Sequence, residues 1–243
     1  MFSIIIPTLN EEEGIAKVLC SIPKEIRKKS EVIVVDTSSD YTPIIAERLG
    51  AKVIREKIKG KGRQMRKGVE ISKGDILIFL DGDGTDPPEY IPKLLKKLET
   101  SNLVLGCRSM KKFRTDDRAM KDAYKIYSFF VLPLFHLINF KFSDPLAGFR
   151  AIRREDWDKL NLKSNSFEIE TEMNIKAMKE RFTIKEVAIP HLKRCGGLKK
   201  SKFARDPKMW FKILGTVLKY LKDEKLEPKI KDFKVKLKLE LGI

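Results

Sequence analysis

The chain has 243 residues, enough for one large α/β domain with a substantial core, and it carries 51 Lys and Arg against 34 Asp and Glu, a formal charge of +17. This charge favours an anionic partner, such as nucleic acid, a membrane surface or a phosphorylated small molecule. Because the basic residues are spread along the chain without an RNA-binding signature, we expect no nucleic-acid partner.

The cysteines and the first residues favour a reducing compartment. Cys20, Cys107 and Cys195 are far apart, and no two of them have metal-ligand spacing. Residues 1–9 lack the basic start and the longer apolar core of a signal peptide. The longest uncharged stretch, 126–140, is shorter than the roughly twenty residues of a membrane-spanning helix. We therefore expect a cytoplasmic protein without a transmembrane segment.

Short apolar runs alternate with helix signals over the first 108 residues. The acids after Asn10 suit the positive start of a helix, and Leu49-Gly50 is a typical helix end. Alternating strands and helices with short connections predict right-handed crossovers and a parallel sheet. The strands are expected at 2–7, 31–35, 51–54, 75–80 and 103–105, and the helices at 11–29, at 42–50, after Gly62 and at 88–100.

The pattern changes in the second half, which we expect to complete the sheet and to build the wall that holds an acceptor. The alternation of apolar and basic residues in the tail has the period of a strand, either an edge strand or a pairing segment. The expected elements are a long helical stretch at 116–140, a strand at 147–153, an amphipathic helix at 168–180, a strand at 184–189, a basic loop at 198–202, a helix near 207–221 and the tail strand at 229–241.

Two carboxylates one residue apart, Asp81 and Asp83, follow the apolar run 75–80. Such a run is typical of a buried parallel strand, and the acids then emerge at the sheet edge where open α/β sheets bind ligands. Mg²⁺ takes carboxylate oxygens together with substrate phosphates. We therefore interpret the pair as holding a metal between the protein and a diphosphate. The alternative is a solvated turn, because Asp and Gly dominate turns.

Basic side chains near this edge are candidate phosphate ligands. The loop 57–66 does not have Walker spacing, but it opens a helix, which places Lys61 and the helix N-terminus near an anion. We expect Lys57 and Lys59 on a solvated face. Arg108 ends the last strand of the first half, and its planar fork matches phosphate oxygens.

Five motifs occur in register along the chain: Pro7-Thr8-Leu9-Asn10-Glu11, Asp36-Thr37-Ser38-Ser39-Asp40-Tyr41-Thr42, Gly74-Asp75 before Asp81-Gly82-Asp83, Gly106-Cys107-Arg108, and Asp144-Pro145-Leu146-Ala147-Gly148-Phe149-Arg150. Together they resemble the family 2 glycosyltransferases of GT-A fold, and among these the dolichol-phosphate mannose and glucose synthases, over about residues 2–202. The resemblance implies an α/β fold with a Rossmann-like, mostly parallel central sheet flanked by helices.

The resemblance also implies the reaction and the domain organisation. The enzyme is expected to be a metal-dependent inverting transferase that moves a sugar from a GDP- or UDP-linked donor to a polyprenyl phosphate, as a peripheral protein at the inner face of the cell membrane. The expected domain is 1–202, with a nucleotide-binding half at 1–108 and an acceptor half at 109–202 that includes amphipathic helices at 118–140. A C-terminal helix and basic tail follow at 203–243.

Alternatives to this interpretation remain open at this point. A soluble family 2 enzyme would act on a hydroxyl of a small molecule or glycan. Outside enzymes, the chain would be a nucleotide-sugar-binding module or a basic surface-binding protein, and the intact Asp81, Asp83 and Arg108 argue against the binding module. The apolar residues of 124–140 either face the bilayer, as in similar synthases, or pack in the core or in a homodimer.

In similar enzymes, the positions of Pro7, Glu11 and Asp36 line the nucleoside pocket. A carboxylate at Asp36 can accept hydrogen bonds from a base or ribose. The alternative for the segment 36–42 is a turn in which Ser39 or Asp40 caps the helix that follows.

For the metal, the resemblance makes Asp83 the main ligand and Asp81 a ribose contact or second metal ligand, with Gly82 adjoining the donor. The synthases usually carry Gln two residues after the second acid, whereas this chain has Thr85. A hydroxyl or a water would then complete the shell of Mg²⁺ or Mn²⁺.

The basic segment 191–202 resembles the flexible loop that closes over donor and acceptor phosphates in the synthases, with Arg194 and Lys202 as candidate ligands. Surface charge is the alternative for both. If the acceptor were a hydroxyl, a carboxylate would have to act as general base, and Asp144 and Glu172 are the candidates. A turn before Pro145 and an exposed helix position are the respective alternatives.

Overall fold

The computed structural model describes residues 1–108, 143–144, 146–190 and 192–195, with 212–213, 215–216 and 219. By contacts, the chain divides into two units, Met1–Phe113 with Ser143–Lys199 and Arg114–Phe142 with Lys200–Ile243. The described residues of the expected helix near 207–221 are helical. The expected elements at 116–140, 198–202 and 229–241 lie outside the described residues, and the domain boundary after residue 202 stays a prediction.

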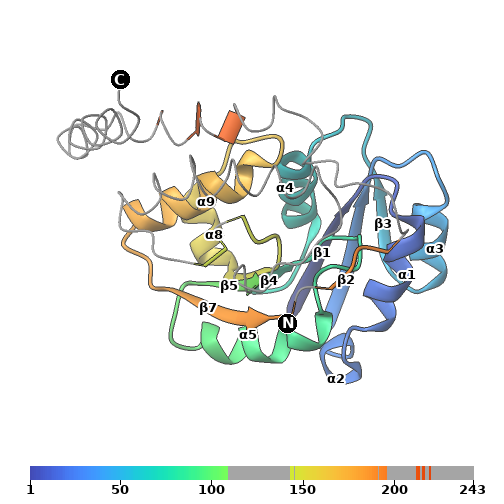
Figure 1. Cartoon of the computed structure of the whole chain (residues 1–243), viewed down its shortest axis with the longest axis horizontal. Coiled ribbons are helices and arrows are strands. Elements are labelled where there is room, and N and C mark those ends of the chain that lie inside the picture. Colours follow the sequence, from blue (N-terminus) through green and yellow to red (C-terminus); the bar gives the residue numbers. More distant parts are fainter. Residues whose placement is uncertain are drawn as a thin grey trace, which may run out of the picture. The chain divides into compact units, whose positions relative to one another are not determined.

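A seven-stranded sheet in the order β3-β2-β1-β4-β6-β5-β7 forms the centre of the first unit (Figure 1). β6 is antiparallel to both of its neighbours, and all other neighbouring strands are parallel, which confirms the mostly parallel sheet. The strands are β1 Phe2–Thr8, β2 Ser30–Asp36, β3 Lys52–Arg55, β4 Ile76–Phe79, β5 Leu103–Arg108, β6 Arg150–Arg153 and β7 Ile184–Ile189.

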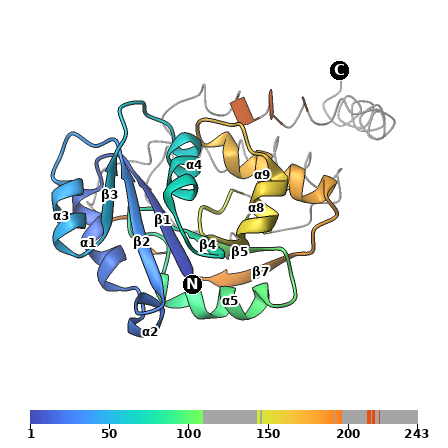
Figure 2. The same cartoon turned by 180° about the vertical axis from the view of Figure 1, so that it is seen from behind.

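Helices cover both faces of this sheet (Figures 1 and 2). Successive strand residues point to opposite faces, so Ile4 and Ile6 pack toward α1 and α5, whereas Phe79 contacts Trp157 of α8 on the face that α4 and α9 also cover. The helices are α1 Glu12–Cys20, α2 Lys24–Arg27, α3 Thr42–Arg48, α4 Lys61–Ile71, α5 Ile91–Leu98, α8 Arg154–Leu160 and α9 Glu168–Lys179, with a short 3₁₀ turn η1 at Pro88–Tyr90.

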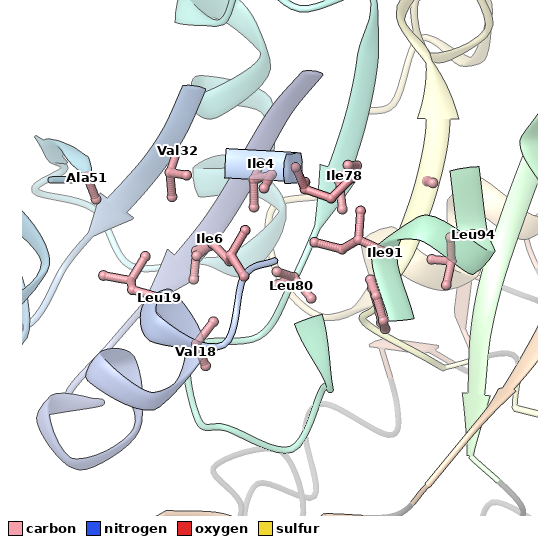
Figure 3. Close-up of a cluster of buried hydrophobic side chains, with 14 of the residues drawn as sticks. Ile4, Ile6, Val18, Leu19, Val32, Ala51, Ile78, Leu80, Ile91 and Leu94 are labelled. Carbon is pink, nitrogen blue, oxygen red and sulfur yellow. The ribbon is translucent and has the colours of Figure 1, made fainter. Parts of the chain in front are cut away.

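The core on the α1 and α5 face is built from branched aliphatic side chains, which fit the pleated surface of a buried strand. Figure 3 shows the strand residues and helix residues that meet there, namely Ile4, Ile6, Ile78, Leu80, Val18, Leu19, Ile91 and Leu94. β1 and β4 are parallel, with Phe79 paired to Ile5, so the residues following both strands lie at the same edge of the sheet.

Two local expectations were wrong, and one helix was missed. The helix expected at 11–29 is two helices, α1 and α2. Pro23 lies between them, and a proline inside a helix would remove a backbone hydrogen bond. The seven-residue helix α8 was not predicted. The helix expected to be amphipathic, α9, buries polar residues on several sides, among them Glu170, Glu172 and Asn174.

Candidate active site

The acid pair occupies a tight turn at the carboxyl end of β4, beside the end of the parallel strand β1, as predicted. Gly84 has φ +79°, a left-handed conformation that glycine adopts without strain. The N–H and the hydroxyl of Thr85 donate to Asp83 Oδ1 at 3.0 and 2.6 Å. The turn interpretation of these residues is therefore correct as geometry, and the turn fixes the direction of the Asp83 carboxylate.

Arg194 joins this turn to the amino end of α1. Its guanidinium donates to Asp83 Oδ2 at 2.7 Å and to both carboxylate oxygens of Glu11 at 2.5 and 2.7 Å. The N–H of Cys195 donates to the carbonyl oxygen of Asp83 at 3.0 Å. Burial lowers the pKa of Arg194, but the charges of Asp83 and Glu11 outweigh it and raise the pKa overall. Three predicted site residues, distant in sequence, thus form one ion-pair network.

Lys61 holds the other acid of the pair. Its ammonium lies 2.6 Å from Asp81 Oδ1 and 2.6 Å from Glu170 Oε1. Burial raises the pKa of Asp81, yet the charge and hydrogen bond of Lys61 hold this pKa below its ordinary value. Lys61 therefore lies at the acid pair, and its predicted contact with a substrate phosphate stays a prediction. Sequence reasoning missed Glu170, because residues two apart on a helix do not share a face and the candidate Glu172 therefore gave no signal for it.

Arg108, at the end of β5, is paired with a carboxylate from the loop before β6. Its Nε donates to Asp144 Oδ2 at 2.9 Å, and the charge of Asp144 is the main cause of the raised pKa of Arg108. Asp144 is also a turn residue, because its carbonyl oxygen accepts the N–H of Ala147 at 3.1 Å. The Asp144 carboxylate thus orients a candidate phosphate ligand, and its role as a base stays a prediction.

Asp86 is a further buried carboxyl that sequence reasoning missed. It is 2% exposed, and its Oδ2 accepts the N–H of Asp81 at 3.0 Å. Burial and the nearby charge of Asp81 raise its pKa from 3.8 to about 7. Because it bonds the backbone at the start of the acid turn, Asp86 ties this turn to the residues that follow it.

Replacing Asp86 by Asn is expected to stabilise the protein more at about pH 8 than at about pH 5. Between 3.8 and about 7, the unfolded carboxyl has lost its proton while the folded one still binds it. The free energy of unfolding of the wild type therefore falls as the pH rises through this window, and Asn removes that loss. Urea unfolding at both pH values measures the effect. An equal gain at both would contradict the raised pKa.

Asp36 lies at the carboxyl end of β2 and is fully buried. One oxygen accepts the hydroxyls of Thr8 and Ser38 at 2.6 and 2.5 Å. The other accepts the N–H of Ser38 at 2.9 Å and the guanidinium of Arg55. These four donors match the acceptor capacity of a carboxylate. Asp36 is therefore a fully bonded, buried carboxylate at the end of β2, and its place in a nucleoside pocket and its contact with a donor stay predictions.

The structure also locates the remaining predicted residues. Pro7 is buried in β1, and the backbone of Gly82 packs against α1. Glu172 is not exposed: it is 2% exposed, accepts the N–H groups of Lys163 and Ser164, and pairs with Lys176. Lys202 lies outside the described residues. As expected, Lys57 and Lys59 are exposed, and Asp40 accepts the N–H of Thr42 at the start of α3.

The residues at this edge suit a hard divalent cation. Mg²⁺ is commonly held by one or two carboxylates with water and substrate phosphates. Among the described residues, no three His, Cys, Asp or Glu side chains gather as a ligand cage, so substrate oxygens or water would supply the other positions. In the described part of the chain, three basic side chains, Lys61, Arg108 and Arg194, form ion pairs at this edge, where six carboxyl groups lie. We call the six the acid cluster: Glu11, Asp81, Asp83, Asp86, Asp144 and Glu170.

Solved structures show the class to which this fold belongs. Glucosyl-3-phosphoglycerate synthase from Mycobacterium tuberculosis, crystallised with Mn²⁺ and UDP-glucose, is 22% identical, with a TM-score of 0.72 over 90% of this chain and 78% of that one. Its structure with Mg²⁺ and UDP gives a TM-score of 0.71 at 21% identity, over 90% of this chain and 79% of that one. The shared fold is the GT-A fold of glycosyltransferases.

The sequence then identifies the family. The family model of glycosyl transferase family 2 matches residues 3–160. A dolichyl-phosphate hexose transferase of Haloferax volcanii is 32% identical over 207 residues, 83% of this chain and 87% of that protein. A dolichol-phosphate mannosyltransferase of Pyrococcus furiosus is 29% identical over 187 residues, 72% of this chain and 52% of that protein. The chain belongs to glycosyl transferase family 2 and is a glycosyltransferase, which confirms the family and enzyme class predicted from the motifs.

The sequence predicts that the chain has no transmembrane helix. Within the described part of the chain, none of the helices combines the length and the apolar character that crossing a bilayer requires. The apolar stretch 124–140 lies outside it.

Proposed function

We propose that this glycosyltransferase moves a hexose from a GDP- or UDP-linked donor to a polyprenyl phosphate at the cytoplasmic face of the membrane, with Mg²⁺ or Mn²⁺ at Asp81 and Asp83. The observation that carries the proposal is the acid cluster with its paired cations at the carboxyl edge of the sheet. The similarity to a dolichyl-phosphate hexose transferase along most of both chains supports the choice of acceptor.

The proposed donor site uses the described side chains in distinct roles. Among the ion-paired acids of the acid cluster, Asp81 is the most open, with 29% of its side chain exposed against 13% for Asp83, so we expect an entering ligand to contact it first. A divalent cation bound there would act as a Lewis acid on the leaving diphosphate. Arg108 and Arg194 would stabilise the same developing charge as oriented hydrogen-bond donors.

The pairing of the candidate bases favours a phosphate acceptor over a hydroxyl. A lipid phosphate with a second pKa of about 6 already carries an oxyanion at neutral pH, and it needs no general base. A hydroxyl acceptor needs a carboxylate that can take its proton. Asp144 is committed to Arg108, and Glu172 is committed to Lys176 and two backbone N–H groups. This arrangement supports attack by a phosphate oxygen, with inversion at the anomeric carbon expected from the family resemblance.

The purified protein is expected to convert labelled nucleotide sugar into chloroform-soluble label when it is given a short polyprenyl phosphate and Mg²⁺ or Mn²⁺. Several GDP- and UDP-linked sugars are tested in parallel, and EDTA is the control because it removes the cation. Label that appears only as free sugar, or only on water-soluble acceptors, would contradict the lipid acceptor and support the soluble alternative. Turnover that persists in EDTA would contradict the metal role.

A further inference from the structure

Lys61 is shared between two carboxylates that come from different elements. It is the first residue of α4, whereas Asp81 follows β4 and Glu170 lies on α9. The ammonium is 2.6 Å from an oxygen of each acid. The Lys61 side chain is 10% exposed and that of Glu170 is 4% exposed, so solvent screens this pair weakly, whereas Asp81, 29% exposed, is the open member of the triad.

The position of an ammonium between two acids decides how much negative charge each acid presents to a ligand. With Glu170 ionised, Lys61 compensates Asp81 only in part, and Asp81 keeps charge for a divalent cation. Without that second negative charge, Lys61 would be committed to Asp81 alone. Because Coulomb attraction is strong where water is excluded, Asp81 would then attract a divalent cation less.

We propose that Glu170 is a positioning residue: it shares the Lys61 ammonium with Asp81, so that Lys61 compensates Asp81 only in part, and thereby sets the divalent-cation affinity of the acid pair. The proposal rests on the proposed function, in that it takes Asp81 as a metal ligand. It also gives Lys61 a lasting anchor, since Glu170 keeps the ammonium at the site when a ligand occupies Asp81. Neither the family motifs nor the sequence pattern assigned this carboxylate a role.

The neighbouring acid on the same helix provides a matched control. Glu172 is as buried as Glu170, with both residues 3% exposed or less, and it is also ion-paired. Its partner is Lys176 at 2.8 Å, four residues along α9. Replacing either acid by Gln removes one buried charge from α9, but the ion pair that is lost is with Lys61 for Glu170 and with Lys176 for Glu172.

The test compares full-length wild type with Glu170→Gln, Glu172→Gln and Lys61→Met. Binding of Mn²⁺ is measured by the electron paramagnetic resonance signal of the free ion, with the protein alone and with UDP or GDP, and circular dichroism reports folding. Glu170→Gln is expected to weaken Mn²⁺ binding about three- to tenfold. Glu172→Gln is expected to lower the melting temperature and leave Mn²⁺ binding at the wild-type value. Lys61→Met is expected to tighten Mn²⁺ binding, because the ammonium that competes with the metal for Asp81 is removed.

The outcomes separate this proposal from the proposed function. If the wild type binds Mn²⁺ and Glu170→Gln binds it equally well, the positioning role is wrong and the metal site stands. Equal weakening in Glu170→Gln and Glu172→Gln would also overturn it, since a general loss of charge or rigidity would then suffice. If Glu170→Gln does not fold, weaker binding in Lys61→Met overturns the proposal. A wild type that binds no Mn²⁺ in any of these states overturns the metal site and this inference together.

Discussion

Replacing Asp83 by Ala is expected to reduce sugar transfer by about a thousandfold or more and to abolish cation-dependent nucleotide binding. The change removes one of the two carboxylates that we assign to the metal, and it also removes the partner that draws Arg194 to the acid turn. Transfer assays and titration calorimetry with nucleotide, with and without Mg²⁺, measure the two effects.

The fold is expected to survive this substitution. The Asp83 side chain is 13% exposed, lies outside the apolar core and accepts two turn hydrogen bonds from Thr85. Asp83→Asn is the matched control, because it keeps the shape and an acceptor for Thr85 while losing the charge. The two variants should fail alike in transfer and should unfold near the wild-type temperature. Full turnover in either variant would show that the acid pair does not hold the metal.

Replacing Gly14 by Ala is expected to damage both the fold and the activity. A Cβ atom on Gly14 would lie 2.6 Å from the carbonyl oxygen of Gly82 and 2.8 Å from the carbonyl carbon of Asp83. Both atoms are backbone, so the acid turn or α1 must move. Overpacking of this kind costs about 1–3 kcal/mol of unfolding free energy, and a displacement of about 1 Å at a reacting site can lower the rate about a hundredfold.

The comparison that makes this result specific is Gly215→Ala. Gly215 is helical, and no atom in the described part of the chain lies within 4 Å of a Cβ placed there. Alanine favours a helix over glycine by about 1 kcal/mol, so this variant should be slightly more stable than the wild type. Urea unfolding and the transfer assay are run on both variants. A Gly14→Ala protein with wild-type stability and turnover would mean that α1 does not support the acid turn.

Much of the first half of the fold could be predicted from local pattern. The strands β1, β2 and β4 are continuous apolar runs, which is typical of strands buried on both faces. The antiparallel insertion of β6 between β4 and β5 could not be predicted in this way, because strand direction depends on the path of the chain and not on side-chain periodicity. The short helix α8 could not be predicted for a different reason: seven residues span too few turns to show a clear period of apolar residues.

In the candidate site, some residues could be found from the sequence and others could not. Asp81, Asp83 and Arg108 could be found because each lies at the carboxyl end of an apolar strand, and ends of parallel strands meet at one edge. Asp86 and Glu170 could not be recognised, since a charged residue in a turn or on a helix is usually solvated. Their burial becomes visible only when neighbouring elements close over them.

The amino-acid sequence by itself determined the family, the mostly parallel sheet and the acid pair at its carboxyl edge, because these follow from short motifs and from the period of apolar residues. Only the tertiary structure decided which charges meet. The pairs of Lys61 with Glu170 and of Arg194 with Glu11 join residues more than a hundred positions apart. Local pattern carries no information about such contacts. They arise when separate helices and loops pack at one sheet edge, where buried charges must find partners of opposite sign.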